Sequence, residues 1–395
     1  MLLAAGASLD AVDELDVCAI YRAAQTGDIG LLRALLEKGA NPRSITKSGY
    51  SVLLHACFQP ASAEKISILE QLISLGADPG QISDYGESPL GVSLRFGDFA
   101  AMRLLLRHGA NPGVLQWGPL HQAVAFGTLE EVSSLATSPE ATNANNNNRR
   151  KLSPWLLSFV AGDLAKAQLL ADRGADLTQT DHSGASPLHL AAEFGHTDLI
   201  SWWLGCDADV HTVDASQNAA INRAVGNNHL KAAQALLRGG AGAGGNVNPD
   251  TRAIHFAHSV EMLRLLVESG DADVNCIDGC GDWPLKSAAE ANDVDRTSWL
   301  LEHGAEVDLT STGETALHAA VRSDAREALS LLLENGANPN AKDVDGWTPL
   351  FGAQSSEAIH ALLNAGANPK LTDQADWGPE RWLKDPVLLS ALERK

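Results

Sequence analysis

The chain has 395 residues and a formal net charge of −20, with 29 Lys and Arg residues against 49 Asp and Glu residues. This charge would repel phosphate backbones, so it argues against nucleic acid and favours partner proteins with basic surfaces. Apolar residues make up 45% and aromatic residues only 5%, which predicts a core of Leu and Ala. Five scattered cysteines do not form a disulfide framework, and no apolar run is long enough to span a membrane. We therefore expect an intracellular protein, cytoplasmic or nuclear, that does not bind membranes.

Residues 1–140 repeat a phrase of two leucines, two polar residues and Gly-Ala followed by Asn or Asp. Its endings begin at Gly39, Gly76 and Gly109. The leucines predict the buried face of a helix, and the glycine predicts the helix end because glycine tolerates the left-handed conformation. The stretch Met1 to Leu9 reads as the second half of such a unit, so we expect this N-terminal block to begin with a half repeat.

A second phrase lies between these endings and predicts another helix. It reads Ser88-Pro89-Leu90 in the N-terminal block and Ser186-Pro187-Leu188-His189 further on. A serine side chain can accept a hydrogen bond from an N–H group at the start of a helix, and proline is well tolerated at the first helical position. Each unit is therefore predicted to contain two helices joined by turns.

A polar tract interrupts the pattern at residues 141–152. It is rich in Asn and ends in Arg149-Arg150-Lys151. Such a tract cannot bury apolar surface, which predicts a disordered loop between two blocks of repeats. The three basic residues could form a short targeting signal, but we expect them to be solvated.

Residues 153–395 resume the pattern as a C-terminal block. Its endings begin at Gly174, Gly304, Gly336 and Gly366. A glycine-rich run at 238–246 predicts an insertion, and the unit near 251–275 has room only for a shortened first helix. The polar residues that close the chain predict a terminal cap.

The two phrases recur at spacings near 33 residues over nearly the whole chain, and this recurrence resembles the ankyrin-repeat family. The best single copy runs from Asp181 to His196. The resemblance implies an all-α solenoid of stacked helix–turn–helix units with projecting β-hairpin loops. We expect about eleven repeats, with partial repeats at the ends.

The resemblance also implies a non-catalytic scaffold or adaptor that binds other proteins through its hairpin tips and concave helix face. An alternative is the substrate-recognition portion of a larger protein, such as an F-box-type ubiquitin-ligase component, which the half-repeat start would fit. A small-ligand binder or an enzyme is a third alternative, since a fold alone does not exclude chemistry. We expect no cofactor and no metal.

Seven side chains are candidates for contact with a partner, because interface hot spots favour aromatic residues and arginine. Five of them lie in two consecutive units and are expected to form one aromatic patch with a single cation. These five are Tyr85, Arg95, Phe96, Trp117 and Phe126. Phe194 repeats a position of this set two units later, and Trp347 lies on a late hairpin. The alternative for each is packing against the next repeat.

Two further clusters have residues that could carry chemistry. His189, Glu193 and His196 lie on or beside one helix, and Cys276 and Cys280 flank a turn. The resemblance implies that the two histidines tie the turns together by hydrogen bonds. The cysteines lack a second pair at zinc spacing, so we expect neither cluster to bind a metal.

Overall fold

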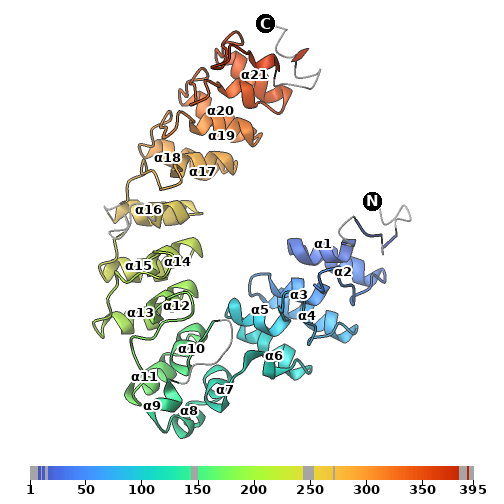
Figure 1. Cartoon of the computed structure of the whole chain (residues 1–395), viewed down its shortest axis with the longest axis vertical. Coiled ribbons are helices and arrows are strands. Elements are labelled where there is room, and N and C mark those ends of the chain that lie inside the picture. The colour runs from blue at the N-terminus through green and yellow to red at the C-terminus, as the bar shows by residue number, and fades with distance from the viewer. Residues whose placement is uncertain are drawn as a thin grey trace. The chain divides into compact units, whose positions relative to one another are not determined.

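The computed structural model describes residues 8–9, 11–13, 17–143, 150–242, 253–269, 272–381 and 389–390 (Figure 1). The predicted half-repeat start and terminal cap lie largely outside these residues, as do residues 144–149 of the Asn-rich tract and residues 243–246 of the glycine-rich run. In the part of the chain that is described, the regular elements are helices, and no helix is long and apolar enough to cross a bilayer. The all-α repeat fold is confirmed.

The chain divides into two compact units, Met1–Leu199 and Ile200–Lys395. Within the first unit, the helices on either side of the Asn-rich tract pack together: α7 (Pro119–Phe126) contacts α10 (Pro154–Ala161). We describe each unit by itself.

In the first unit, first helices alternate with second helices. The first helices are α1 (Ala19–Thr26), α3 (Val52–Cys57), α5 (Pro89–Arg95), α7, α10 and α12 (Pro187–Glu193). The second helices are α2 (Ile29–Glu37), α4 (Ala63–Ser74), α6 (Phe99–Arg107), α8 (Leu129–Leu135), α11 (Leu164–Asp172) and α13 (Thr197–Leu204), which crosses the unit boundary. The connections contain η2 (Pro112–Leu115) and α9 (Pro139–Thr142). Successive first helices stack, α1 on α3 and α3 on α5, so equivalent positions of neighbouring repeats lie side by side.

The second unit continues the same alternation. Its first helices are α14 (Ala220–Gly226), η4 (Ala253–Phe256), α17 (Pro284–Glu290), α19 (Ala316–Arg322) and η5 (Pro349–Gly352), and η6 (Pro379–Arg381) follows. Its second helices are α15 (Leu230–Arg238), α16 (Val260–Glu268), α18 (Val294–Glu302), α20 (Arg326–Glu334) and α21 (Ser356–Asn364). The shortened first helix predicted near 251–275 is the single 3₁₀ turn η4. A second one, η5, was not anticipated.

The local signals act as the sequence predicts. Ser88 Oγ accepts a hydrogen bond from the N–H of Gly91 at 3.1 Å, which caps α5. At the end of α6, Gly109 has a φ angle of 94°, and the following N–H of Ala110 donates to the carbonyl of Leu105 at 2.9 Å. Isolated β-bridges, such as the one between Ile45 and Ser51, close hairpins without forming extended strands. These signals fix the unit length and leave the hairpin tips and first-helix ends open to variation.

A buried ion pair joins two repeats of the first unit. Lys65 Nζ lies 2.9 Å from Asp98 Oδ2, and their side chains are 1% and 2% exposed. The ammonium group also donates to the carbonyls of Cys57 at 2.9 Å and Gln59 at 2.7 Å, where α3 ends. Removal of either charge would leave the other buried and unpaired, which is strongly unfavourable. Burial also raises the pKa of the Cys57 thiol to about 12, so this thiol is protonated and inert at neutral pH.

Candidate protein-binding surface

Aromatic side chains form a row across the first three repeats of the first unit, which we call the aromatic strip. It consists of Tyr21, Tyr50, His55, Phe58, Tyr85 and Phe96. The Tyr21 and His55 ring centres lie 4.3 Å apart, and His55 lies 5.6 Å from Phe58. Phe58 lies 6.2 Å from Phe96. The row is continuous because the stacking of α1, α3 and α5 brings equivalent repeat positions together.

The outer members of the aromatic strip face solvent. Tyr85 is 66% exposed and Phe96 is 43% exposed, while Tyr21 is buried beneath the row. On the hairpin side, the Tyr50 and Tyr85 ring centres lie 6.2 Å apart. An exposed group of aromatic rings on a rigid helical base is the composition that protein interfaces favour.

One acidic side chain organises the polar part of this surface. Glu87 accepts a hydrogen bond from Tyr50 Oη at 2.8 Å and forms an ion pair with Arg95. The Arg95 guanidinium also lies 6.0 Å from the Phe58 ring centre. Burial and the Glu87 carboxylate raise the pKa of Tyr50, and burial lowers the pKa of His55 although Glu87 opposes this shift. The aromatic strip is therefore uncharged at neutral pH, with the Arg95–Glu87 pair at its edge.

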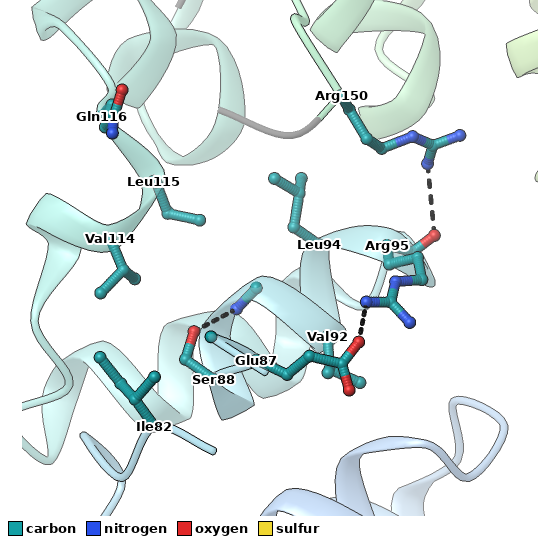
Figure 2. A pocket seen from close by; sticks show the side chains of 12 residues that line it. Ile82, Glu87, Ser88, Val92, Leu94, Arg95, Val114, Leu115, Gln116 and Arg150 are labelled. Carbon is teal, nitrogen blue, oxygen red and sulfur yellow. Dashed lines mark hydrogen bonds and ion pairs between the residues drawn. The ribbon is translucent and has the colours of Figure 1, made fainter. Parts of the chain in front are cut away.

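A pocket of about 240 Å³ adjoins the aromatic strip and is lined by Glu87 and Arg95, the ion pair at the edge of the strip (Figure 2). Its apolar wall comes from the hairpin before α5, from α5 itself and from η2. The wall residues are Ile82, Val92, Leu94, Val114 and Leu115. On the opposite side, Figure 2 shows Arg150 reaching the carbonyl of Arg95. The volume is below that of ordinary small-molecule sites and fits a single large apolar side chain.

The backbone around this pocket is strained at two consecutive hairpins. Gln116, which lines the pocket, has a φ angle of 52°, and Lys151, which follows Arg150, has a φ angle of 49°. Gly86 and Gly184 hold the equivalent position in neighbouring hairpins. A non-glycine residue in this left-handed region costs roughly 1–2 kcal/mol, and such strain is often found at functional sites.

The five residues expected to form one patch divide into two groups. Tyr85 and Phe96 belong to the aromatic strip, and Arg95 lies at its edge, with its guanidinium over the Phe58 ring. Trp117 is only 9% exposed, and its ring centre lies 6.1 Å from that of Phe126. The Phe126 ring lies against Phe99 of α6 at 6.1 Å and beneath the Arg103 guanidinium at 5.7 Å. The second group therefore packs between repeats, the alternative noted for these positions.

The remaining two candidates lie elsewhere. The Phe194 ring lies so close to Gly97 that a Cβ atom on this glycine would be 2.8 Å from it, although the two residues are three repeats apart. Trp347, in the second unit, is half-buried, and its ring stacks on Phe351 with centres 5.8 Å apart. Both residues thus have packing contacts within their own units.

Several members of this site are not among the seven candidates from the sequence, including Tyr21, His55, Phe58 and Arg150. Phe58 occupies the same repeat position as Arg95, directly after the first helix core, so aligning the repeats against one another would have found it. Arg150 was expected to be solvated, yet its side chain is only 13% exposed. Its partners lie up to 55 residues away, and no local pattern reveals them.

The histidine and cysteine clusters that could carry chemistry make hydrogen bonds and close contacts with neighbouring protein groups. His189 Nδ1 lies 2.8 Å from Ser186 Oγ, and His196 Nε2 lies 3.2 Å from the carbonyl of Val160. Cys276 is buried, with its Sγ 3.2 Å from His255 Nε2, and Cys280 is exposed; both are free thiols. Among the described residues, no group of three or more His, Cys, Asp or Glu side chains is arranged to hold a metal ion.

Comparison with known proteins gives partial matches to proteins of different kinds. The chain is 26% identical over 288 residues to the human transient receptor potential cation channel subfamily A member 1, a match that covers 67% of this chain and 25% of the channel. It is 28% identical over 200 residues to an L-asparaginase from Dirofilaria immitis, covering 50% of this chain and 29% of that protein. The chain thus spans less than a third of the length of either relative.

Among solved structures, the chain resembles the crystal structure of the ankyrin repeat domain of Bcl-3, with a TM-score of 0.46 and 25% identity. That match covers 62% of this chain and 98% of the Bcl-3 domain. The family described as "Ankyrin repeats (3 copies)" matches residues 58–150, 156–250 and 251–343, which together make up most of the chain. The chain therefore belongs to the ankyrin-repeat family, whose repeats form protein–protein interaction domains.

Proposed function

We propose that this chain is a non-catalytic interaction scaffold or adaptor whose first unit binds a partner polypeptide through the aromatic strip and the adjoining pocket. One observation carries the proposal: Tyr85 and Phe96 are exposed, and the residues next to them in the chain, Gly86 and Arg95, line a pocket that fits one apolar side chain. Clustered aromatic residues next to a pocket supply most of the free energy in protein interfaces. Contiguous apolar groups on a protein surface usually mark such a contact.

We propose further that the partner carries a basic surface. The second unit holds 28 of the 49 Asp and Glu residues but only 15 of the 29 Lys and Arg residues. A surface with this excess of carboxylates steers basic partners toward the chain and accelerates their association. The exposed free thiols of Cys206 and Cys280 are consistent with binding inside the cell, in the cytoplasm or nucleus.

Affinity purification with the full chain as bait tests this proposal. In Tyr85→Ala/Phe96→Ala, the fold should persist because both side chains are exposed, and partner binding should weaken by about ten-fold or more. Leu75→Ala is the matched control, because Leu75 is 47% exposed and lies at the end of α4, outside the aromatic strip. Equal binding by the double variant and the control would overturn the proposal.

The same purification tests the two alternatives. Recovery of cullin-type components with the native chain would select a ubiquitin-ligase component, in which the aromatic strip would contact the substrate. A small molecule that stays bound in native mass spectrometry, together with unchanged partner recovery by Tyr85→Ala/Phe96→Ala, would favour a ligand-binding or catalytic role over the scaffold.

A further inference from the structure

Arg150 lies in a receptacle built by two other repeats of the first unit. Its Nη2 atom donates to both carboxylate oxygens of Glu193, at 3.1 Å and 3.0 Å. Its Nη1 atom donates to the carbonyl of Arg95 at 3.3 Å, and the guanidinium carbon lies 5.8 Å from the Phe194 ring centre. Two acceptors and an aromatic face thus surround one planar cation, which is the arrangement that favours arginine over lysine.

The receptacle is enclosed, unlike the surroundings of the surface arginines Arg95 and Arg322. The Arg150 side chain is 13% exposed, whereas Arg95 and Arg322 are 44% and 51% exposed. Contacts with a guanidinium are stronger where water is excluded, because charges are less screened there. The contacts of Arg150 therefore count for more than those of a surface ion pair.

A second carboxylate in the receptacle, that of Asp181, has one oxygen atom that accepts no hydrogen bond from the described residues. Asp181 is buried, and its Oδ1 atom accepts hydrogen bonds from Ser183 and Ala185 of its own hairpin. Its Oδ2 atom has no hydrogen-bond donor among the described residues and lies 3.7 Å from Arg150 Nε, beyond hydrogen-bond distance. A buried carboxylate oxygen without a donor is unfavourable. The receptacle can therefore accept one more hydrogen bond from a guanidinium group than it receives from Arg150.

We propose that Asp181, Glu193, Phe194 and the Arg95 carbonyl form an arginine-recognition site, which Arg150 fills within the chain and which an arginine of a partner polypeptide can take over. The partner's arginine would donate to both carboxylates and leave the Arg150 side chain to solvent. This step rests on the proposed function, because the partner must first be held by the aromatic strip and pocket. Arg95 and Arg150 line that pocket, so an anchored partner segment lies beside the site.

A partner's arginine can replace Arg150 only if the partner is also held by the aromatic strip and the pocket, because Arg150 is attached to the same chain as the site. A group held on the same chain has a high effective concentration, so a free arginine in solution competes poorly with it. A partner segment anchored in the pocket would be held near the site in the same way. The site therefore selects a segment with an apolar anchor and an arginine close to it.

Arg150→Ala empties the site and allows it to be tested without any partner. The probe is N-acetyl-arginine amide, the control ligand is N-acetyl-lysine amide, and binding is measured by isothermal calorimetry on the full chain. We expect the arginine amide to bind Arg150→Ala about ten-fold more tightly than it binds the native chain, a difference of about 1.4 kcal/mol. The lysine amide should bind both proteins weakly, because a single ammonium nitrogen cannot reach Glu193, the Arg95 carbonyl and Asp181 at once, whereas the three guanidinium nitrogens of Arg150 each face one of them.

Arg150→Ala/Glu193→Gln is the matched control and should lose the preference for the arginine amide. If Arg150→Ala does not fold, Arg150→Gln keeps a polar side chain that is too short to fill the site, and it is measured in the same way. Equal binding of the two amides by the folded variant, or a preference that survives Glu193→Gln, would overturn the proposal. Arginine-amide binding without any partner dependent on Tyr85 and Phe96 would support the recognition site and remove the proposed protein-binding function.

Discussion

The two units use the same pair of repeat positions for an ion pair. In the first unit, Glu87 of the hairpin binds Arg95 at the end of α5, eight residues later. In the second unit, Glu314 of the hairpin binds Arg322 at the end of α19, again eight residues later. The scaffold thus presents the same two side chains on both surfaces.

The side chain that the preceding repeat places beside this ion pair determines the chemical character of the surface around it. In the first unit the preceding repeat places Phe58 beside the pair, and the Arg95 cation lies over its ring. In the second unit the preceding repeat supplies Glu290, whose carboxylate lies 3.3 Å from Arg322 Nη2. One surface therefore becomes aromatic with a single ion pair, and the other becomes a row of charges, without any change in the helices beneath.

Lys286 extends the row of charges in the second unit. Its Nζ lies 2.6 Å from Asp282 and 3.0 Å from Glu314. Burial disfavours the charged lysine, but the two carboxylates outweigh it and raise the pKa of Lys286. Binding chemistry in a repeat protein can therefore differ between units that share a fold, which is why the fold alone does not identify a partner.

The largest expected difference between the units concerns their buried cations. Lys65→Ala in the first unit should destabilise the chain by about 3–5 kcal/mol, because the Asp98 carboxylate would stay buried without a positive charge beside it. Arg296→Ala in the second unit should cost only about 1–2 kcal/mol, because its partner Asp293 is 32% exposed and can be solvated. Urea-induced unfolding followed by tryptophan fluorescence compares the two variants. Equal losses would mean that burial does not distinguish these pairs.

The row of charges should make the second unit sensitive to acid. Burial opposes the charged form of Glu314, but Lys286 and Arg322 outweigh it and lower its pKa below the ordinary value of 4.5. The stability that this carboxylate contributes is present above pH 4.5 and is lost as the pH falls through the lowered folded-state pKa.

Glu314→Gln tests this dependence directly. The variant should be less stable than the native chain by about 1.5 kcal/mol at pH 7, and the difference should shrink toward pH 3. Unfolding free energies measured from pH 7 to pH 3 check this. A difference that stays constant over that range would show that the charge of Glu314 does not contribute.

The smallest expected effect is a gain in stability in both units. Lys151 and Asp376 are exposed residues with φ angles of 49° and 62° at the position that glycine holds in other hairpins. Lys151→Gly and Asp376→Gly should each stabilise the chain by about 1 kcal/mol, because glycine adopts this conformation without strain. Thermal unfolding measures the gain. A gain for Asp376→Gly alone would indicate that the chain path around Lys151 is already relaxed.

Sequence reasoning predicted the repeated framework because its signals are local. The glycines at helix ends, such as Gly109, and the Ser-Pro caps, such as Ser88-Pro89, act within a few residues of where they stand. Amphipathic helices with such ends leave few ways to fold. The predicted number of repeats and the boundaries of the two predicted blocks stay predictions.

The candidate surface was only partly predictable because its contacts join different repeats. Tyr85, Arg95 and Phe96 were identified from residue type and position. Trp117 is also aromatic and was identified in the same way, but its hairpin has Gln116 in place of the usual left-handed glycine, and its ring turns inward to Phe126. Arg150 was misread as solvated, since its charge is paired by residues far along the chain. Ion pairs between residues so far apart in the chain cannot be predicted from local sequence patterns.

The contact between Phe194 and Gly97 also bears on how the first unit unfolds. In a linear array each repeat touches only its neighbours, so the ends can fray one repeat at a time. Here, Phe194 on Gly97 and Arg150 on the Arg95 carbonyl connect repeats that are not adjacent. These contacts close a ring of repeats, so the repeats between them lose their structure together once the ring opens. Folding must likewise bring together segments about 55 residues apart, which slows it relative to a purely linear array.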